Sequence, residues 1–259
     1  MTICSLKPGL KVLVTAGASG IGRAIADLLI AEGARVHICD VSHEFLEGFQ
    51  AAYPDHGASY CDVSDDEQVV RLFDDVRSSL GGLNALVNNA GIAGPTGGVD
   101  EISPADWRRC IDICLTGQFL CAHHAVPMLK AAGDGAIINM SSAAGRYGYA
   151  YRTPYSAAKW GVIGFTQSLS KELGPFGIRA NAILPGIVSG PRMEGVIRAR
   201  ADQVGVPYEE MQKEYLSRIS LRRMVSPEDV AAMVAFLLSP AAGNISGQSI
   251  GVDGNVESL

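Results

Sequence analysis

The sequence predicts an α/β fold in which helices cover both faces of one doubly wound parallel sheet of the Rossmann type. Two features carry this prediction. Short apolar runs alternate with helical patterns along the chain, and this alternation is typical of parallel sheets. The first apolar run leads through a glycine-rich turn, Ala16 to Gly22, into an amphipathic helix, which is the order found where backbone groups cradle phosphates.

Size and composition favour a single domain. The 259 residues are 47% hydrophobic, which suffices for one large core. No Pro/Gly/Ser-rich linker, internal repeat or low-complexity run divides the sequence. We therefore expect one domain over residues 1–259.

Charge and hydropathy argue against two classes of function. A net charge of −6 is unfavourable for a nucleic-acid-binding protein, which needs a basic face for phosphates. No apolar run approaches the roughly 18 to 20 residues of a membrane span. Residues 1–10 lack the apolar core of a signal peptide. The sequence predicts a cytoplasmic protein that binds neither nucleic acid nor membrane.

Seven short runs are predicted to be strands, because most are apolar and bounded by turn residues. They are Leu10–Thr15, Arg35–Asp40, Ala58–Cys61, Ala85–Asn88, Ala136–Met140, Arg179–Leu184 and Gln248–Val252. Apolar residues recur at helical spacing between most of them. The predicted helices include Arg23–Glu32, Ala105–Ala132 and Pro154–Gly174.

The glycine turn predicts a dinucleotide site. Glycines let backbone N–H groups approach a pyrophosphate, and the helix N-terminus adds its positive dipole end. The spacing is not G-x-G-x-x-G, so a plain tight turn is the alternative. Asp40 ends the second predicted strand, eighteen positions after Gly22, about where an acidic residue meets the adenosine ribose. A carboxylate there repels a 2′-phosphate, and Val41 follows it, so NAD is favoured over NADP. The alternative for Asp40 is a cap of the next helix.

The stretch from Ser142 to Lys159 carries three groups that can move a proton. Ser142 follows a predicted strand, so it lies at the sheet edge where ligands of such folds bind. Tyr155 and Lys159 are four residues apart in a predicted helix and share one face. An isolated tyrosine titrates near pH ~10, so a tyrosine base needs a nearby positive charge at neutral pH. We expect Lys159 to supply it, Ser142 to hold the substrate oxygen, and Tyr155 to exchange a proton with that oxygen. An accidental Tyr-x-x-x-Lys on a surface helix is the alternative.

The six cysteines include no C-x-x-C pair, and a cytoplasmic setting disfavours disulfides, so most are predicted to be small core residues. One helical segment gathers Cys110, Cys114, Cys121, His123 and His124. Their offsets match no common zinc pattern, and we expect no metal site.

These residues carry a resemblance over the whole chain. The sequence resembles the short-chain dehydrogenase/reductase family, in its shorter single-domain class. The matching positions are Thr15 to Gly22, Asp62-Val63, Asn88-Asn89-Ala90-Gly91, Ser142, Tyr155-x-x-x-Lys159, Asn181, Pro185-Gly186 and Val252-Asp253-Gly254.

The resemblance implies a role for each matching segment. The glycine turn, with Ala16, Gly17, Ser19, Gly20, Ile21 and Gly22, would hold the pyrophosphate. Asp40 would bind the adenosine ribose, Asp62 and Val63 the adenine, and Asn89, Ala90 and Gly91 would form the floor beneath the cofactor. Pro185, Gly186 and Val188 would flank the nicotinamide, and Lys159 would also hold the nicotinamide ribose. Ser142, Tyr155 and Lys159 match the catalytic triad of the family.

Three positions depart from the family pattern. Ala16 replaces the first glycine of the turn, which is costly if that position needs a positive φ, although Gly17 could absorb the turn. Gly190 stands where the family often has a threonine that contacts the carboxamide, and the adjacent Ser189 is a substitute. Cys114 occupies the place of an asparagine that helps to position a relay water, and a thiol hydrogen-bonds far more weakly. Three outcomes stay open for Cys114: its backbone carbonyl suffices, the relay is slower, or turnover is lost.

The substrate is expected to meet residues 190–225, where the family carries a variable lid. Arginines in and near this segment, with Arg152 and Arg192 foremost, suit a carboxylate, phosphate or sulfonate. Interspersed glutamates make a solvated helix pair the alternative. Tyr147, Tyr149 and Tyr151 suggest a partly apolar pocket for a sugar, polyol or hydroxy acid, or could pack beneath the lid.

We therefore predict an NAD-dependent dehydrogenase that oxidises a secondary alcohol of a small polar metabolite. Two alternatives stay open: an NADPH-dependent carbonyl reductase, for example of 3-oxoacyl thioesters, and a dinucleotide-binding sensor without turnover. The long helices at 105–132 and 154–174 resemble those of the family's subunit interfaces, so we predict a homotetramer.

Overall fold

The computed structural model describes residues 5–256, apart from the side chains at positions 192, 199 and 203. Across these residues seven strands form one parallel sheet in the order β3-β2-β1-β4-β5-β6-β7. The strands are β1 (Lys11–Thr15), β2 (Arg35–Asp40), β3 (Gly57–Tyr60), β4 (Ala85–Asn88), β5 (Gly135–Met140), β6 (Ile178–Pro185) and β7 (Ser249–Val252). The predicted strands are confirmed, and only their ends differ slightly.

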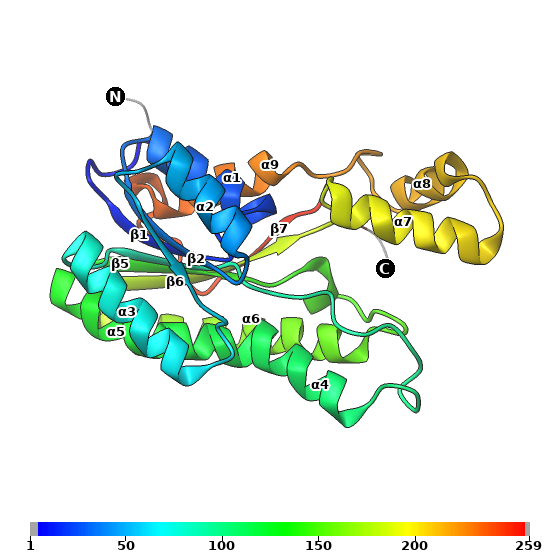
Figure 1. The fold of residues 1–259 in the computed structure, drawn as a ribbon, viewed down its shortest axis with the longest axis horizontal. Helices are drawn as coiled ribbons and strands as arrows, with labels where there is room; N and C mark the ends of the chain where they lie inside the picture. Colours follow the sequence, from blue (N-terminus) through cyan, green and yellow to red (C-terminus); the bar gives the residue numbers. More distant parts are fainter. Residues whose placement is uncertain (1–4, 257–259) are drawn as a thin grey trace.

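Helices cover both faces of this sheet, as Figure 1 shows. One layer contains α1 (Gly20–Ala31), α2 (His43–Ala52) and α9 (Pro227–Leu238), whose Ile25, Phe49 and Val234 share an apolar core. The other contains α3 (Asp66–Leu80), α4 (Pro104–Ile111), α5 (Gly117–Ala132) and α6 (Thr153–Leu173). Phe73 and Leu129 belong to the apolar core on that side. The doubly wound architecture predicted from the alternation is confirmed.

The strand order changes direction at β1, which pairs with both β2 and β4. In open sheets of this kind, ligands bind beyond the carboxyl ends of the strands next to such a point. The predicted site segments all follow strand ends: residues 16–22 follow β1, Asp40 ends β2, residues 89–91 follow β4, and Ser142 follows β5. The topology therefore brings them to one edge.

The segment predicted as one helix at 105–132 is not continuous α-helix. Residues Asp112–Thr116 form a π turn between α4 and α5, and the N–H of Gly117 bonds to the carbonyl of Asp112. Such turns interrupt the regular ladder and are frequent at functional sites. Cys114 lies in this turn, so the departure from α-helix falls on the residue that already departs from the family sequence.

The expected lid region forms two helices, α7 (Pro191–Val204) and α8 (Tyr208–Ser217), that extend beyond the sheet at the right of Figure 1. They pack on each other through a small apolar cluster that includes Ile197 and Met211, separate from the two main cores.

Within residues 5–256, no helix is both long and apolar enough to span a membrane.

One buried histidine makes the stability of the fold depend on pH. His37 on β2 is 2% exposed, and its ring nitrogens lie 2.7 Å from the Ser79 hydroxyl and 2.9 Å from the Ser59 hydroxyl. Burial lowers the pKa of His37 to about 4, although the Asp75 carboxylate opposes this shift. His37 is therefore neutral in the folded protein at neutral pH.

Acid should destabilise the fold partly through His37. An unfolded histidine binds a proton near pH ~6.5, whereas folded His37 does so only near pH 4. The folded pKa is depressed, so the contribution of His37 is present above pH ~6.5 and is lost as the pH falls toward 4. Between these values the free energy of unfolding should fall by about 3 kcal/mol more in wild type than in His37→Gln. Urea unfolding at several pH values measures both, and parallel curves would contradict the assignment.

Candidate active site

The turn after β1 has the shape of a phosphate cradle. Gly22 passes so close to the turn that an added Cβ would lie 2.0 Å from the carbonyl oxygen of Ala16. The helix α1 begins at Gly20 with no side-chain cap at Ser19 and no acidic residue in its first turn. A free helix N-terminus beside bare backbone attracts an anion. The predicted residues Gly20, Ile21 and Gly22 thus fit a pyrophosphate.

Ala16 itself takes the positive φ of this turn. Its φ is +48°, whereas Gly17 is not among the residues with positive φ. Gly17 is needed for another reason, because a Cβ there would lie 2.6 Å from Cγ2 of Ile38. The expectation that Gly17 could absorb the turn is wrong. The strain of a left-handed alanine remains in the loop.

The segment after β4 supports the turn from beneath. The N–H groups of Asn89 and Ala90 both donate to the hydroxyl of Thr15, at 2.9 Å each. The side-chain amide of Asn89 donates to the carbonyls of Thr15 and Ala16, at 3.1 Å each. These bonds hold the strained alanine in place. Thr15 matched the family only as part of the glycine-turn motif, but its hydroxyl links this turn directly to the segment after β4.

Asp40 faces the glycine turn rather than capping a helix. Its carboxylate accepts hydrogen bonds from the N–H of Ala18 at 3.2 Å and from the N–H of Val41 at 2.8 Å. The cap of α2 is Ser42, whose hydroxyl accepts from the N–H of Phe45. The capping alternative for Asp40 is therefore wrong.

Asp62 and Val63 lie beyond β3, where the adenine was expected. Burial opposes the charge on Asp62, but hydrogen bonds from Ser64 and the Arg109 guanidinium outweigh it and hold the pKa of Asp62 below its ordinary value. Val63 is 5% exposed and packs against Gly117. Asp62 is thus a fixed anion at this edge of the site.

The segment after β6, expected beside the nicotinamide, is held from two sides. The N–H of Gly186 donates to the carbonyl of Val252, and the N–H of Ser189 donates to the carbonyl of Val225. Val188 forms a parallel bridge with Val225. Gly190 has a φ of +137°, which favours glycine, so the backbone itself disfavours a threonine there.

The three proposed catalytic groups come from β5 and α6. Ser142 follows β5 and is half-buried, and its hydroxyl accepts a bond from the N–H of Ala144 at 3.2 Å. Lys159 is 3% exposed, and its Nζ donates to the carbonyl of Met140 at 2.8 Å and lies 5.6 Å from the centroid of the Tyr155 ring. Among residues 5–256, no carboxylate pairs with Lys159. The Lys159 ammonium is therefore a buried positive charge next to the Tyr155 ring.

Two serines attach α6 to the segment that carries Ser142. The hydroxyl of Ser141 donates to the carbonyl of Lys159 at 2.7 Å, and the hydroxyl of Ser156 donates to the carbonyl of Ala144 at 3.0 Å. Hydrogen bonds to the backbone therefore help to fix the relative positions of the three proposed catalytic side chains.

Cys114 contributes through both its thiol and its carbonyl. Its Sγ lies 3.4 Å from both the N–H and the carbonyl oxygen of Ile92, which attaches α5 and the π turn to the segment after β4. Its carbonyl accepts a bond from Nε2 of Gln118 at 3.2 Å. Gln118 also donates to the carbonyl of Met140, the same oxygen that Lys159 binds. Gln118 was not predicted, because the sequence does not distinguish a buried amide from an exposed one.

The cysteines that the structure describes are buried core residues, as predicted for most of them. Cys39, Cys61, Cys110, Cys114 and Cys121 are all buried with free thiols. The hydrogen bond with Cys114, together with burial, raises the pKa of the Cys110 thiol, although Lys159 and Arg152 oppose this shift. Within the described residues no three His, Cys, Asp or Glu side chains are grouped to hold a metal. Cys4 lies outside the described residues.

Of the residues predicted to meet substrate, Arg152 lies beside the catalytic groups. Its guanidinium carbon is 5.3 Å from the Tyr155 ring centroid and 5.2 Å from that of Tyr149. The side chain of Arg192 lies outside the described residues, although its backbone belongs to α7. Arg198 instead stacks on Tyr208, which joins α7 to α8.

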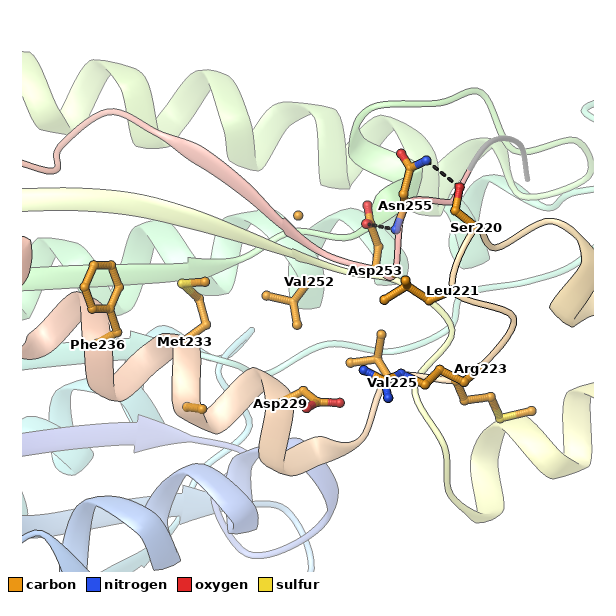
Figure 2. A pocket seen from close by; sticks show the side chains of 14 residues that line it. Ser220, Leu221, Arg223, Val225, Asp229, Met233, Phe236, Val252, Asp253 and Asn255 are labelled. Carbon is orange, nitrogen blue, oxygen red and sulfur yellow. Dashed lines mark hydrogen bonds between the residues drawn. The ribbon is translucent and has the colours of Figure 1, made fainter. Parts of the chain in front are cut away.

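A separate hollow of about 640 Å³ lies between α9, the end of β7 and residues 220–225 (Figure 2). Met233, Phe236 and Val252 line it with apolar surface, and the side chain of Asn255 bonds to the Ser220 hydroxyl at its rim. None of the proposed catalytic residues lines it. The hollow is therefore distinct from the candidate active site.

Comparison with known proteins gives consistent matches. A family model described as enoyl-(acyl carrier protein) reductase matches residues 15–256. The chain is 40% identical to cis-4-hydroxycyclohexanecarboxylate dehydrogenase of Sinomonas cyclohexanicum over 93% of this chain and 94% of that one. It is 36% identical to 2-dehydro-3-deoxy-L-rhamnonate dehydrogenase (NAD(+)) of Sphingomonas sp. strain SKA58, over 89% and 88% of the two chains. A solved structure of actinorhodin polyketide ketoreductase with NADPH superposes with a TM-score of 0.90 at 33% identity, covering 96% of this chain and 97% of that one.

The strain at Ala16 predicts that Ala16→Gly is stabilising. Glycine relieves the left-handed conformation but loses more entropy on folding, so the net gain in unfolding free energy should be roughly 0.5–1 kcal/mol. Denaturant unfolding measures it. Gly17→Ala is the matched control and should be destabilising, because its Cβ would meet Ile38. A loss of stability in Ala16→Gly would contradict the assignment.

Proposed function

This chain belongs to the short-chain dehydrogenase/reductase family, and from that premise we propose that it is an NAD-dependent dehydrogenase of secondary alcohols. The observation that carries the proposal is the buried Lys159 ammonium. It lies 5.6 Å from the Tyr155 ring centroid, and no carboxylate among the described residues neutralises it. Burying an unpaired charge is costly, so a lysine placed in this way indicates a catalytic use.

Each side chain then has a distinct task. Lys159 stabilises the phenolate of Tyr155, and the Tyr155 oxygen removes the proton of the substrate hydroxyl. Ser142 donates a hydrogen bond to the substrate oxygen as it becomes a carbonyl. NAD, when bound, supplies the acceptor for the hydride that leaves the substrate carbon bearing this oxygen. The glycine turn, Asp40 and residues 185–188 would hold this cofactor.

Asp40 supports NAD over NADP. Its carboxylate is fixed by the N–H groups of Ala18 and Val41, so it stays at the end of β2. A 2′-phosphate would meet this fixed negative charge, whereas a ribose diol can donate hydrogen bonds to it. Val41 is 56% exposed and offers no positive charge to a phosphate.

A small polar alcohol is the substrate class that we favour: a sugar, polyol or hydroxy acid. Two relatives support it by name, since one acts on a hydroxylated ring that bears a carboxylate and the other on a sugar acid. The half-buried Tyr147 and Tyr149 supply mixed polar and apolar surface near the site.

The direct test is NADH formation from NAD⁺ with a panel of sugars, polyols and hydroxy acids, 4-hydroxycyclohexanecarboxylate among them. Wild type should turn over at least one member, and Tyr155→Phe should lose activity by about 100-fold or more, because the phenol that exchanges the proton is gone. NAD⁺ binding, measured by calorimetry, should persist in Tyr155→Phe. Turnover that survives this substitution would contradict the assigned role.

Two alternatives remain distinguishable by the same assay. An NADPH-dependent carbonyl reductase is favoured by the likeness to a ketoreductase bound to NADPH. Stronger binding of NADPH than NADH would select it and refute the role given to Asp40.

A sensor without turnover is motivated by Cys114 and Ala16. It would bind cofactor but convert no substrate, and Cys114→Asn would then create activity rather than adjust it.

We also propose that the protein is a homotetramer. The helices α4, α5 and α6 expose Trp107, Phe119 and Trp160, at 39%, 49% and 51%, which suits self-association of helices. Static light scattering should give four times the chain mass of 27.2 kDa. Trp160→Glu should reduce that mass, whereas Phe45→Glu on α2, which removes an equally exposed aromatic, should not. A monomeric mass for wild type would contradict the proposal.

A further inference from the structure

Arg152 places a positive charge at the edge of the catalytic centre. Its guanidinium contacts the rings of Tyr149 and Tyr155, and its NH2 group donates to the carbonyl of Ala93. The side chain is half-buried. The guanidinium therefore lies among one catalytic ring, a neighbouring ring and the loop that follows β4.

This charge is not balanced within the protein. Among the described residues no carboxylate pairs with Arg152, and its Nε is buried without a hydrogen-bond partner. A half-buried guanidinium without a counter-ion is unfavourable, and one carboxylate could pair with it through two parallel hydrogen bonds. Among the described residues, Arg152 is thus left without a carboxylate partner.

The start of α6 adds to the same deficit. Arg152 is the N-cap residue of this 21-residue helix, no side chain caps it, and its first turn contains no acidic residue. The hydroxyl of Thr153 at the first position is buried without a partner. A helix N-terminus stabilises a nearby anion. The start of the helix that carries Tyr155 therefore also favours an anion.

The backbone before Arg152 is strained in a way that fixes this placement. Tyr151 has a φ of +63°, which is rare for a bulky residue, and its side chain is 66% exposed. Its carbonyl accepts a bond from the N–H of Gly97. The turn sends Tyr151 to solvent and Arg152 toward Tyr155. Such strain is typically retained at functional sites.

We propose that Arg152 binds a carboxylate of the substrate, so that the substrates are hydroxy acids rather than uncharged sugars or polyols. The inference rests on the proposed dehydrogenase function and narrows its substrate class. A single guanidinium balances one negative charge, which suits a carboxylate better than a doubly charged phosphate. The carboxylate at Arg152 and the hydroxyl at Tyr155 together orient the substrate.

A purely structural role makes a different prediction. If Arg152 only attached the loop at Ala93 to α6, its removal would weaken charged and neutral ligands alike. The test is therefore a comparison of two ligands of one shape, cyclohexanecarboxylate and cyclohexanecarboxamide. Their binding to the complex with NAD⁺ is measured by calorimetry, which needs no turnover.

Wild type should bind the carboxylate more tightly than the carboxamide, and Arg152→Gln should reduce that preference by about 10- to 100-fold. Arg152→Lys should keep part of it, because the charge remains without the planar fork. Arg146→Gln is the matched control. Arg146 is an exposed cation in the same segment, and its guanidinium donates to the carbonyl of Ser249. It should keep the full preference.

Three results would overturn the proposal: no preference for the carboxylate in wild type, a preference that survives in Arg152→Gln, or equal loss in Arg146→Gln. Tighter binding of cyclohexyl phosphate than of cyclohexanecarboxylate would overturn the choice of carboxylate.

Turnover assays separate this inference from the function it rests on. Oxidation of uncharged alcohols with no role for Arg152 would leave the dehydrogenase function intact. Carboxylate preference without any turnover would support the inference and count against the function.

Discussion

The buried ammonium of Lys159 is the constraint on which the site depends. Its Nζ donates to the carbonyl of Met140 at 2.8 Å. This bond joins α6 to the end of β5, two residues before Ser142. Gln118 binds the same carbonyl and also the carbonyl of Cys114. One backbone oxygen therefore receives donors from two helices. Moving any of these elements would move the positive charge away from the Tyr155 ring.

Several features that cost free energy lie in the segments that form the candidate site. Ala16 and Tyr151 hold positive φ values, and the π turn at 112–116 interrupts the helix ladder. Each of these features costs free energy on its own. They persist because bonds from rigid elements over-determine them, as Asn89 does for Ala16. The two cores on either side of the sheet supply the stability that this arrangement requires.

The fold was predictable because its signals are local and repeated. Apolar runs and glycine turns define the strands, and strand ends place Ser142, Asp40 and the glycine turn at one edge whatever the details of packing. The roles of Tyr155 and Lys159 followed from their spacing and chemistry, and the family resemblance added the cofactor contacts at residues 62–63, 89–91 and 185–188. The sequence was less informative where tertiary contacts decide. The sequence did not show that Ala16 takes the positive φ, nor that Gly17 is required instead because Ile38 lies close to it.

Two other features follow from contacts that no spacing specifies. The π turn is a backbone irregularity within an otherwise helical pattern, and Gln118 differs from a surface glutamine only by its burial among polar backbone groups. Arg152 was a candidate for binding an anion because of its charge and its position three residues before Tyr155. Its missing counter-ion and the uncapped start of α6 became visible only in three dimensions.

The central claim is that the buried Lys159 ammonium supports proton transfer by Tyr155, and the most direct measurement is kcat/KM at neutral pH for wild type and Lys159→Met. In Lys159→Met kcat/KM should be lower by about 100-fold or more, because the positive charge next to the Tyr155 ring is gone. Unfolding measured in parallel should show that Lys159→Met stays folded. A folded Lys159→Met with an unchanged kcat/KM would contradict the account.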